Sequence, residues 1–249
     1  MWKIKSAILI FLLTLSTPSK ATSLELALVL DGSGSVSASD YQLQLDGYLN
    51  AFTSASFYSN YVANSIYDEI YLSAWQFSST VIEEVGWTLI DSQAAATSFG
   101  NLFNTTDMAQ LGGLTYTDVA IDAVVTSMAG NGIEGTLIMD ISTDGVATDS
   151  AAALLSADNA RSAGVTINAI GVGSIDASFL SDLVGIGSGS AYSGFYLTAS
   201  DFTEFGTALD TKLEVEVTGV NEVPGPASIG FFSAGLLFLG SVLRRRKKA

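Results

Sequence analysis

The chain has 249 residues, of which 48% are hydrophobic and only 14% are charged, so it is long enough for one domain with a substantial core. It contains no Cys and no His, which excludes disulfides, zinc sites built from Cys and His, and the Cys–His and Ser–His–Asp arrangements of nucleophilic enzymes. Any chemistry must therefore come from carboxylates, hydroxyls and backbone groups.

The charge is distributed unevenly along the chain. Between Ala21 and Leu243 lie all 25 acidic residues but only two basic ones, Arg161 and Lys212, which gives this stretch a net charge of −23. So acidic a surface repels phosphate groups, and we expect no nucleic-acid partner. The high apolar content excludes intrinsic disorder. The acidic charge fits a folded protein that must stay soluble in salty surroundings or that attracts cations.

Residues 1–21 have the features of a secretory signal peptide. Lys3 and Lys5 precede an apolar stretch of signal length, and Ser19 and Ala21 place small residues at the two positions that a signal peptidase reads. We therefore expect cleavage after Ala21 and export of the rest of the chain. An uncleaved anchor helix is the alternative, but the stretch is short for a membrane span.

Residues 22–215 are predicted to form one α/β domain in which strands and helices alternate. The strand at 24–30 ends in a continuous apolar run, as a buried parallel strand does, and the helix at 38–52 has Tyr41, Leu45, Tyr48 and Phe52 at helical spacing. Further strands are expected at 69–77, 81–89, 136–140, 165–171 and 194–198. Further helices are expected at 91–103, 117–129, 150–163, 176–183 and 201–213, and Asp201 is expected to cap the last of them. The segment 185–194 is expected to be a surface loop. This order predicts a doubly wound, mostly parallel sheet flanked by helices, with 81–89 as one antiparallel edge strand.

The C-terminal part resembles a sorting signal. A linker at 216–226 leads into Val223, Pro224, Gly225, Pro226 and Ala227, and the segment 227–249 consists of an uncharged apolar run followed by a basic tail. This order resembles the PEP-CTERM signal of Gram-negative bacteria, although Gly225 stands where that signal has Glu. The resemblance implies an exosortase-like sorting enzyme, at least transient anchoring in the inner membrane, and a place at the cell surface or in the biofilm matrix. Simple anchoring by a C-terminal transmembrane helix is the alternative.

Three segments of oxygen donors follow predicted strands or precede a helix. Asp31, Ser33 and Ser35 come directly after the first strand, in a loop whose glycines let these side chains converge. Thr115 precedes the helix at 117–129, and Asp144 follows the strand at 136–140. In a doubly wound sheet, ligands gather beyond the carboxyl ends of the strands. Carboxylate and hydroxyl oxygens in such a position favour Mg²⁺, Mn²⁺ or Ca²⁺.

Asp-Gly-Ser-Gly-Ser, then Gly-Leu-Thr-Tyr-Thr, then Thr-Asp-Gly resembles the metal-ion-dependent adhesion site (MIDAS) of the von Willebrand factor A family, over essentially all of residues 24–213. The resemblance implies that the metal ligands are Asp31, Ser33, Ser35, Thr115 and Asp144, with Mg²⁺ as the first choice of ion. Asp118 and Asp140 are candidates for contacting these ligands without binding the ion themselves. For Asp118 a place at a helix N-terminus, and for Asp140 a purely structural role, are the alternatives.

The resemblance also implies the function. We expect an exported, surface-associated adhesion or assembly protein, not an enzyme, that binds a divalent cation and through it a carboxylate of a protein or matrix ligand. A metal-assisted hydrolase is the rival interpretation, but the absence of His and the single Lys of the domain stand against it. A structural surface domain without a specific metal site is the third interpretation.

Overall fold

Six strands form one sheet in the computed structural model, which describes residues 22–219. Their order across the sheet is β3-β2-β1-β4-β5-β6, and only the β2–β3 pair is antiparallel. The strands are β1 (Ser23–Asp31), β2 (Glu69–Phe77), β3 (Val81–Leu89), β4 (Gly135–Thr143), β5 (Val165–Val172) and β6 (Tyr196–Ala199). The predicted doubly wound, mostly parallel sheet with one antiparallel edge strand is therefore confirmed.

The predicted terminal signals lie outside the described residues. These are the signal peptide at 1–21, the sorting motif at 223–227 and the apolar segment at 227–249. Between residues 22 and 219, no helix is both long enough and apolar enough to cross a membrane.

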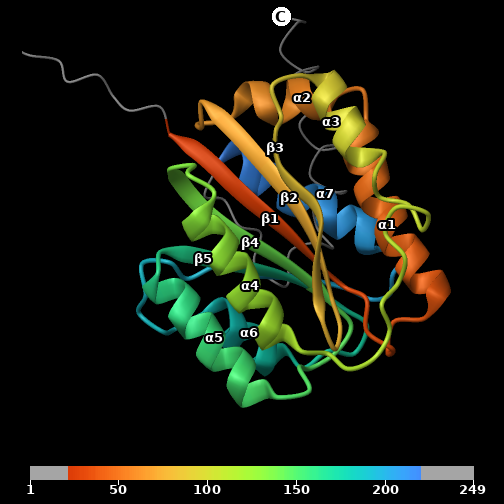
Figure 1. Cartoon of the computed structure of the whole chain (residues 1–249), viewed down its shortest axis with the longest axis vertical. Helices are drawn as coiled ribbons and strands as arrows, with labels where there is room; N and C mark the ends of the chain where they lie inside the picture. The colour runs from red at the N-terminus through yellow and green to blue at the C-terminus, as the bar shows by residue number, and fades with distance from the viewer. Residues whose placement is uncertain (1–21, 220–249) are drawn as a thin grey trace, which may run out of the picture.

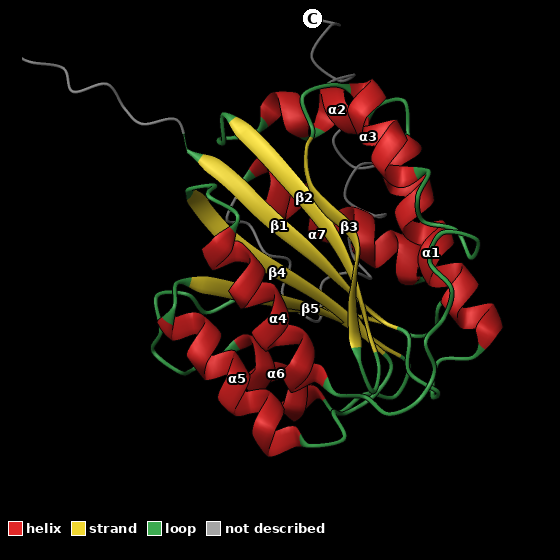
Figure 2. Cartoon of the chain, viewed as in Figure 1, coloured by secondary structure: helices red, strands yellow, loops and turns green. Residues whose placement is uncertain are grey.

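Helices cover both faces of the sheet (Figure 1; Figure 2). One face carries α1 (Ala38–Thr53), α3 (Gln93–Gly100) and α7 (Phe205–Thr218), with the short helices α2 (Phe57–Asn60) and η1 (Val62–Asn64) beside them. The other face carries α4 (Thr117–Gly130), α5 (Ser150–Ser162) and α6 (Ala177–Val184). The loops that leave the carboxyl ends of the parallel strands gather at one end of the sheet, at the lower right of Figure 2.

The central strand β1 supplies both layers of the core. Its side chains alternate, so that Leu26 and Leu28 pack toward α1 and α7, while Ala27 and Val29 pack toward α4 and α5. All nine residues of β1 are buried, which explains its apolar sequence. This strand therefore holds the loop that follows it between two packed layers.

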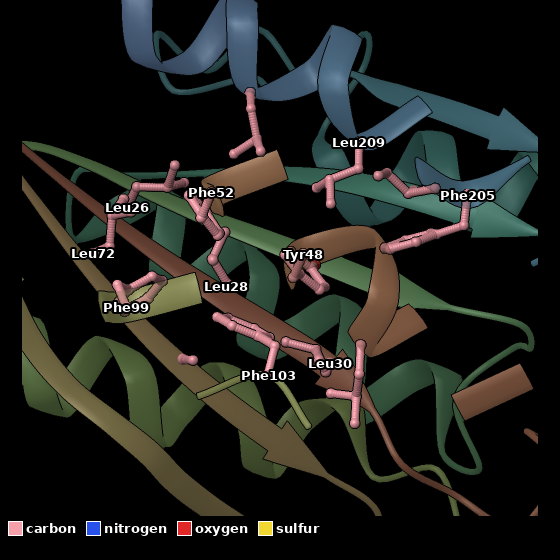
Figure 3. Packing of buried hydrophobic residues seen from close by; sticks show 14 of the residues in the cluster. Leu26, Leu28, Leu30, Tyr48, Phe52, Leu72, Phe99, Phe103, Phe205 and Leu209 are labelled. Carbon is pink, nitrogen blue, oxygen red and sulfur yellow. The ribbon is translucent and has the colours of Figure 1, made fainter. Parts of the chain in front are cut away.

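Aromatic side chains fill the layer between β1 and α1 (Figure 3). The ring of Tyr48 stacks on Phe103 with centroids 4.9 Å apart, and Phe52 meets Phe99 edge to face at 5.2 Å. Phe205 brings α7 into the same cluster, with its ring centroid 5.5 Å from that of Tyr48. The predicted inner face of the helix at 38–52 is confirmed, since Tyr41, Leu45, Tyr48 and Phe52 are all buried.

The structure corrects several predicted boundaries. The last helix begins at Phe205 and continues to Thr218, and Asp201 does not cap it. The Asp201 carboxylate instead accepts hydrogen bonds from the backbone N–H groups of Thr203 and Glu204, in a turn before the helix. The predicted helix at 91–103 is limited to Gln93–Gly100, capped by Ser92. The strand predicted at 136–140 extends to Thr143, which carries its polar residues into the sheet.

Candidate metal centre

The first and third donor segments leave neighbouring strands at the same edge of the sheet. β1 and β4 are parallel and in register, with Leu30 opposite Ser142. Asp31 ends β1 and Thr143 ends β4, so the loops that begin at Gly32 and Asp144 start side by side. This pairing, which no local sequence pattern specifies, brings residues more than 100 positions apart into one site.

A continuous set of hydrogen bonds links four of the predicted ligands. The backbone N–H of Ser33 donates to Asp31 Oδ1 at 2.8 Å. The hydroxyl oxygens of Ser33 and Ser35 lie 3.0 Å apart, and the Ser35 hydroxyl donates to Asp144 Oδ1 at 2.8 Å. The structure therefore brings Asp31, Ser33, Ser35 and Asp144 together. Asp31 and Ser33 are buried, whereas Ser35 is exposed, so the set opens to solvent on one side.

Asp31 is a fully buried carboxylate that neighbouring donors hold in place. Thr143 Oγ1 donates to Asp31 Oδ2 at 2.6 Å, which occupies the second carboxylate oxygen. Burial raises the pKa of Asp31, the hydrogen bonds from Ser33 and Thr143 lower it, and the nearby Asp144 carboxylate raises it further. A cation beside Asp31 opposes that rise, because an opposite charge favours the ionised carboxylate.

A second row of polar side chains lies behind this loop, in the layer under α1. Gln44 Nε2 donates to the backbone carbonyl of Asp31 at 3.0 Å, and Gln44 Oε1 accepts from the Ser142 hydroxyl at 2.7 Å. Tyr48 Oη lies 3.4 Å from Ser142 Oγ. Gln44 is fully buried on the inner face of α1. Neither Gln44 nor Thr143 was predicted as a site residue from the sequence, although a Gln at an otherwise apolar position of the helix at 38–52 was a usable signal for Gln44.

The loop before α4 is fastened to the Asp31–Ser35 loop. Gly34 N–H donates to Gly113 O at 2.9 Å, and Gly112 N–H donates to Gly32 O at 2.8 Å. Gln110 Nε2 reaches the carbonyl of Ser33 at 3.2 Å. Gly113 has a φ of 102°, which favours glycine, and a Cβ there would lie 2.5 Å from Ser79 Oγ. The two glycine-rich loops therefore support each other.

Gln76 of β2 holds this pair of loops from below. Its Oε1 accepts from the backbone N–H of Leu111 at 2.7 Å, and its Nε2 donates to Ala109 O at 3.1 Å. A Cβ on Gly32 would lie only 2.1 Å from the same Oε1, so only glycine leaves room for this contact. Gln76 was not predicted from the sequence either, because its role depends on a loop 33 residues further along the chain.

Thr115 is held between the second and third loops. Its backbone N–H donates to Thr148 Oγ1 at 3.0 Å, and its carbonyl accepts from Thr148 N–H at 2.9 Å. Thr115 as a whole residue is 9% exposed. Thr115 does not cap the following helix, because the N-cap of α4 is Tyr116, which makes no capping bond with its side chain. The backbone of Thr115 is therefore fixed beside the loop that carries Asp144.

The structure separates the two candidate supporting aspartates. Asp118 lies in the first turn of α4, where the helix dipole favours a carboxylate, and its Oδ1 is buried without a hydrogen-bond partner among the described residues. Asp140 instead forms a buried ion pair with Lys212 of α7, and Lys212 also pairs with Glu216 at 2.8 Å. Asp140 therefore joins β4 to α7, which fits the structural alternative for this residue.

The donor set fits a small divalent cation. Oxygen atoms bound side by side to Mg²⁺ at about 2.1 Å lie about 3 Å apart. The Ser33–Ser35 and Ser35–Asp144 oxygen distances of 3.0 and 2.8 Å match this spacing. No group of three or more acidic side chains arranged to hold a metal occurs within residues 22–219, so this candidate rests on hydroxyls as much as on carboxylates. Hydroxyl and carboxylate oxygens are hard ligands and suit Mg²⁺, Mn²⁺ or Ca²⁺.

Comparison with protein families gives one match along most of the chain. The family model described as "Protein of unknown function (DUF1194)" matches residues 21–221. No curated protein matches the sequence.

Solved structures share the fold at low sequence identity. Proximal thread matrix protein 1 (PTMP1) from the mussel byssus, described with a zinc-occupied MIDAS motif, is 19% identical with a TM-score of 0.59, over 78% of this chain and 48% of that one. A von Willebrand factor type A structure from Catenulispora acidiphila is 12% identical with a TM-score of 0.58, over 79% and 43% of the two chains. The pilus adhesin SpaC from Lactobacillus rhamnosus GG is 14% identical with a TM-score of 0.56, over 81% and 31%.

These likenesses establish a von Willebrand factor A-like fold, and at such identities they establish the fold alone. The chain spans less than half the length of each of these three proteins.

Proposed function

This chain belongs to the DUF1194 family of proteins of unknown function, and we propose that it is a binding protein that holds a divalent cation at the carboxyl edge of its sheet. Asp31, Ser33, Ser35, Thr115 and Asp144 are the proposed ligands, and Mg²⁺ is the proposed ion, with Mn²⁺ or Ca²⁺ as alternatives. The observation that supports this proposal most directly is the hydrogen-bonded row of Ser33, Ser35 and Asp144 oxygens beside the buried Asp31.

The site suits binding of an outside carboxylate. When bound, a divalent cation supplies positive charge that only two nearby carboxylates, Asp31 and Asp144, offset. The remaining proposed ligands are neutral hydroxyls that add no negative charge, so the ion with its ligands is close to neutral and still accepts a further carboxylate oxygen as a ligand. Ser35 lies on the exposed side of the set, where an incoming group has access. The ligand class is therefore an acidic group of a protein or of a matrix component.

The position of the single lysine in residues 22–219 favours binding over metal-assisted hydrolysis. Lys212 is buried under α7 in ion pairs with Asp140 and Glu216, so it is not a general base at the candidate centre. The names of two structures that share the fold, a byssus matrix protein and a pilus adhesin, support the same choice by analogy. We therefore propose a role in adhesion or matrix assembly.

Export is part of the proposal and rests on the terminal sequences. Residues 1–21 favour secretion, and the Val223–Ala227 motif with the apolar segment and basic tail favours recognition by an exosortase-like enzyme and at least transient membrane anchoring. The proposed location is the cell surface or extracellular matrix of a Gram-negative bacterium.

Calorimetric titration of Mg²⁺, Mn²⁺ and Ca²⁺ into the full chain tests the metal site. We expect one saturable site that disappears in Asp144→Asn, because this change removes a proposed ligand oxygen while preserving the size of the side chain. Asp122→Asn is the matched control, since Asp122 lies exposed on α4 outside the loops. Weak binding to many sites, unchanged by Asp144→Asn, would contradict the proposal.

A further inference from the structure

The charge around the candidate centre limits which carboxylate ligand it can bind. A divalent cation with Asp31 and Asp144 is close to neutral, so a partner carboxylate adds one uncompensated negative charge. No positive side chain near the surface of residues 22–219 offsets it, because the only basic residues there, Arg161 and Lys212, are 4% and 0% exposed. Both are occupied in ion pairs.

The same edge of the sheet carries further acidic residues. Asp149, Asp176 and Asp201 are exposed, and each follows the carboxyl end of a different strand, β4, β5 or β6. Their combined field repels an isolated anion within about 10 Å at moderate ionic strength. A ligand that approaches this edge therefore needs basic groups of its own beside its carboxylate.

Large apolar side chains are exposed on the loops next to the centre. Leu114 is 50% exposed and directly precedes Thr115, and Val146 is 42% exposed and lies two residues after Asp144. Val119, in the first turn of α4, is 40% exposed. The two hydrogen bonds between Thr115 and Thr148 hold the loops of Leu114 and Val146 together. We call Leu114, Val119 and Val146, the exposed apolar residues of these loops and of the first turn of α4, the apolar rim.

We infer that the partner is a protein segment in which one acidic residue is flanked by large apolar side chains and surrounded by lysine or arginine. This inference rests on the proposed metal site and names the partner for it. The carboxylate of the segment binds at the centre, its apolar neighbours cover Leu114, Val119 and Val146, and its basic residues face the acidic edge.

Labelled synthetic peptides test the inference on the full chain in the presence of Mg²⁺, with fluorescence anisotropy as the readout. The reference peptide has one Asp between two Leu, with Lys on either side. We expect it to bind, and to lose binding when Asp is replaced by Asn or when EDTA is added. Replacement of its Lys residues by Glu is expected to weaken binding by at least about tenfold at low salt and by less at high salt, because salt screens the acidic edge.

Protein variants test the apolar rim separately. The double variant Leu114→Ser, Val146→Ser is expected to bind the reference peptide about tenfold more weakly. Its Mg²⁺ affinity, measured by calorimetry, is expected to stay unchanged. Ile186→Ser is the matched control, because Ile186 is 51% exposed in the loop after α6, away from the centre. Its affinity for the peptide is expected to equal that of the unmodified chain.

The outcomes separate this inference from the proposed function. Mg²⁺-dependent binding of every Asp-bearing peptide, with the same affinity for Lys-flanked and Glu-flanked forms and no effect of the rim variant, would overturn the inference and leave the metal site standing. Absence of Mg²⁺-dependent binding for all Asp-bearing peptides, with one Mg²⁺ site still seen by calorimetry, would overturn the inference alone. Absence of the calorimetric site would overturn the proposed function together with the inference.

Discussion

At the scale of single residues, the candidate centre depends on side chains that hold Asp31 as much as on the proposed ligands themselves. Asp31 is fully buried, and both of its carboxylate oxygens accept hydrogen bonds, one from Ser33 N–H and one from Thr143 Oγ1. A buried charge that loses a partner is costly, because no water replaces the lost bond.

Thr143→Val tests this support. The change preserves the shape of the side chain but removes the hydroxyl that donates to Asp31 Oδ2. We expect a loss of about 1–3 kcal/mol in the free energy of unfolding, measured by urea denaturation in EDTA, and a lower Mg²⁺ affinity. Thr143→Ser keeps the hydroxyl and is expected to lose much less. Equal losses in the two variants would indicate that packing, not the hydrogen bond, is responsible.

Gly32→Ala tests the fit between the Asp31–Ser35 loop and Gln76. An added Cβ meets Gln76 Oε1 at 2.1 Å, so Gln76 must move and release Leu111 N–H. We expect weaker Mg²⁺ binding and a lower melting temperature. Gly130→Ala, at the end of α4 with no atom within 4 Å of the added Cβ, is the control and is expected to be neutral or slightly stabilising. Unchanged metal binding in Gly32→Ala would show that this contact is dispensable.

At the scale of elements, a buried charge cluster fastens α7 to the sheet. Lys212 and Glu216 lie one turn apart on α7, and Lys212 also pairs with Asp140 of β4. Asn168 of β5 donates to Glu216 at 2.7 Å, and Phe195 lies under the Lys212 ammonium group. Two buried carboxylates share one buried ammonium group, so the cluster has one excess negative charge when all three groups are ionised. Binding of one further proton makes the cluster neutral.

Glu216→Gln tests the protonation of this cluster. Burial and the nearby Asp140 carboxylate raise the pKa of Glu216 to about 7 despite Lys212. A folded-state pKa above the unfolded value means that the folded protein binds the proton more tightly. Protonation of Glu216 therefore adds to the free energy of unfolding below the unfolded pKa of this residue, and that contribution is lost as the pH rises toward 7. The loss is at most about 1.4 kcal/mol per pH unit.

The measurement is urea unfolding at several pH values between 4.5 and 7, in EDTA so that metal binding does not contribute. We expect Glu216→Gln to reduce the fall in stability across this range, because the amide does not titrate. Glu214→Gln is the control on the same helix and is expected to leave the pH dependence unchanged. An identical pH dependence in the unmodified chain and in Glu216→Gln would contradict the account of the cluster.

Most of the helices and strands could be predicted from the sequence, whereas several site residues could not. Continuous apolar runs such as 24–30 predict buried strands because both faces of these strands are covered, and helix 38–52 follows from its apolar spacing. The predicted start of the last helix, at Asp201, was wrong. An Asp side chain can accept hydrogen bonds from backbone N–H groups either in a turn or at a helix N-terminus, and Asp201 does so in a turn before α7. Thr143, Gln44 and Gln76 acquire their roles from strand pairing and loop contacts far along the chain, which local patterns do not contain.

At the scale of the whole molecule, the surface is acidic throughout the described residues. Residues 22–219 contain 24 acidic residues, of which Glu25, Asp31, Asp140 and Glu216 are buried and the other 20 are partly or fully exposed, whereas the two basic residues, Arg161 and Lys212, are both buried. Charges of one sign repel each other most strongly when the chain is compact, so the fold carries an electrostatic penalty that salt screens.

Monovalent salt is therefore expected to raise the melting temperature of the metal-free protein. Thermal unfolding in EDTA at increasing NaCl concentration measures this effect, and most of the rise is expected once the Debye length has fallen to about 10 Å. The same titration in saturating Mg²⁺ is expected to start from a higher melting temperature, since binding to the folded state stabilises it. A melting temperature that falls with added NaCl would contradict this account of the surface.

The central claim is that one divalent cation binds where the loops after β1 and β4 meet, and crystallography with Mn²⁺ tests it most directly. Crystals of the protein grown with Mn²⁺ are predicted to show one strong anomalous peak within bonding distance of Ser33 Oγ and Ser35 Oγ, and beside Asp144. Crystals of Asp144→Asn under the same conditions are predicted to lack it. Anomalous peaks only elsewhere on the acidic surface, or none at these loops, would contradict the claim.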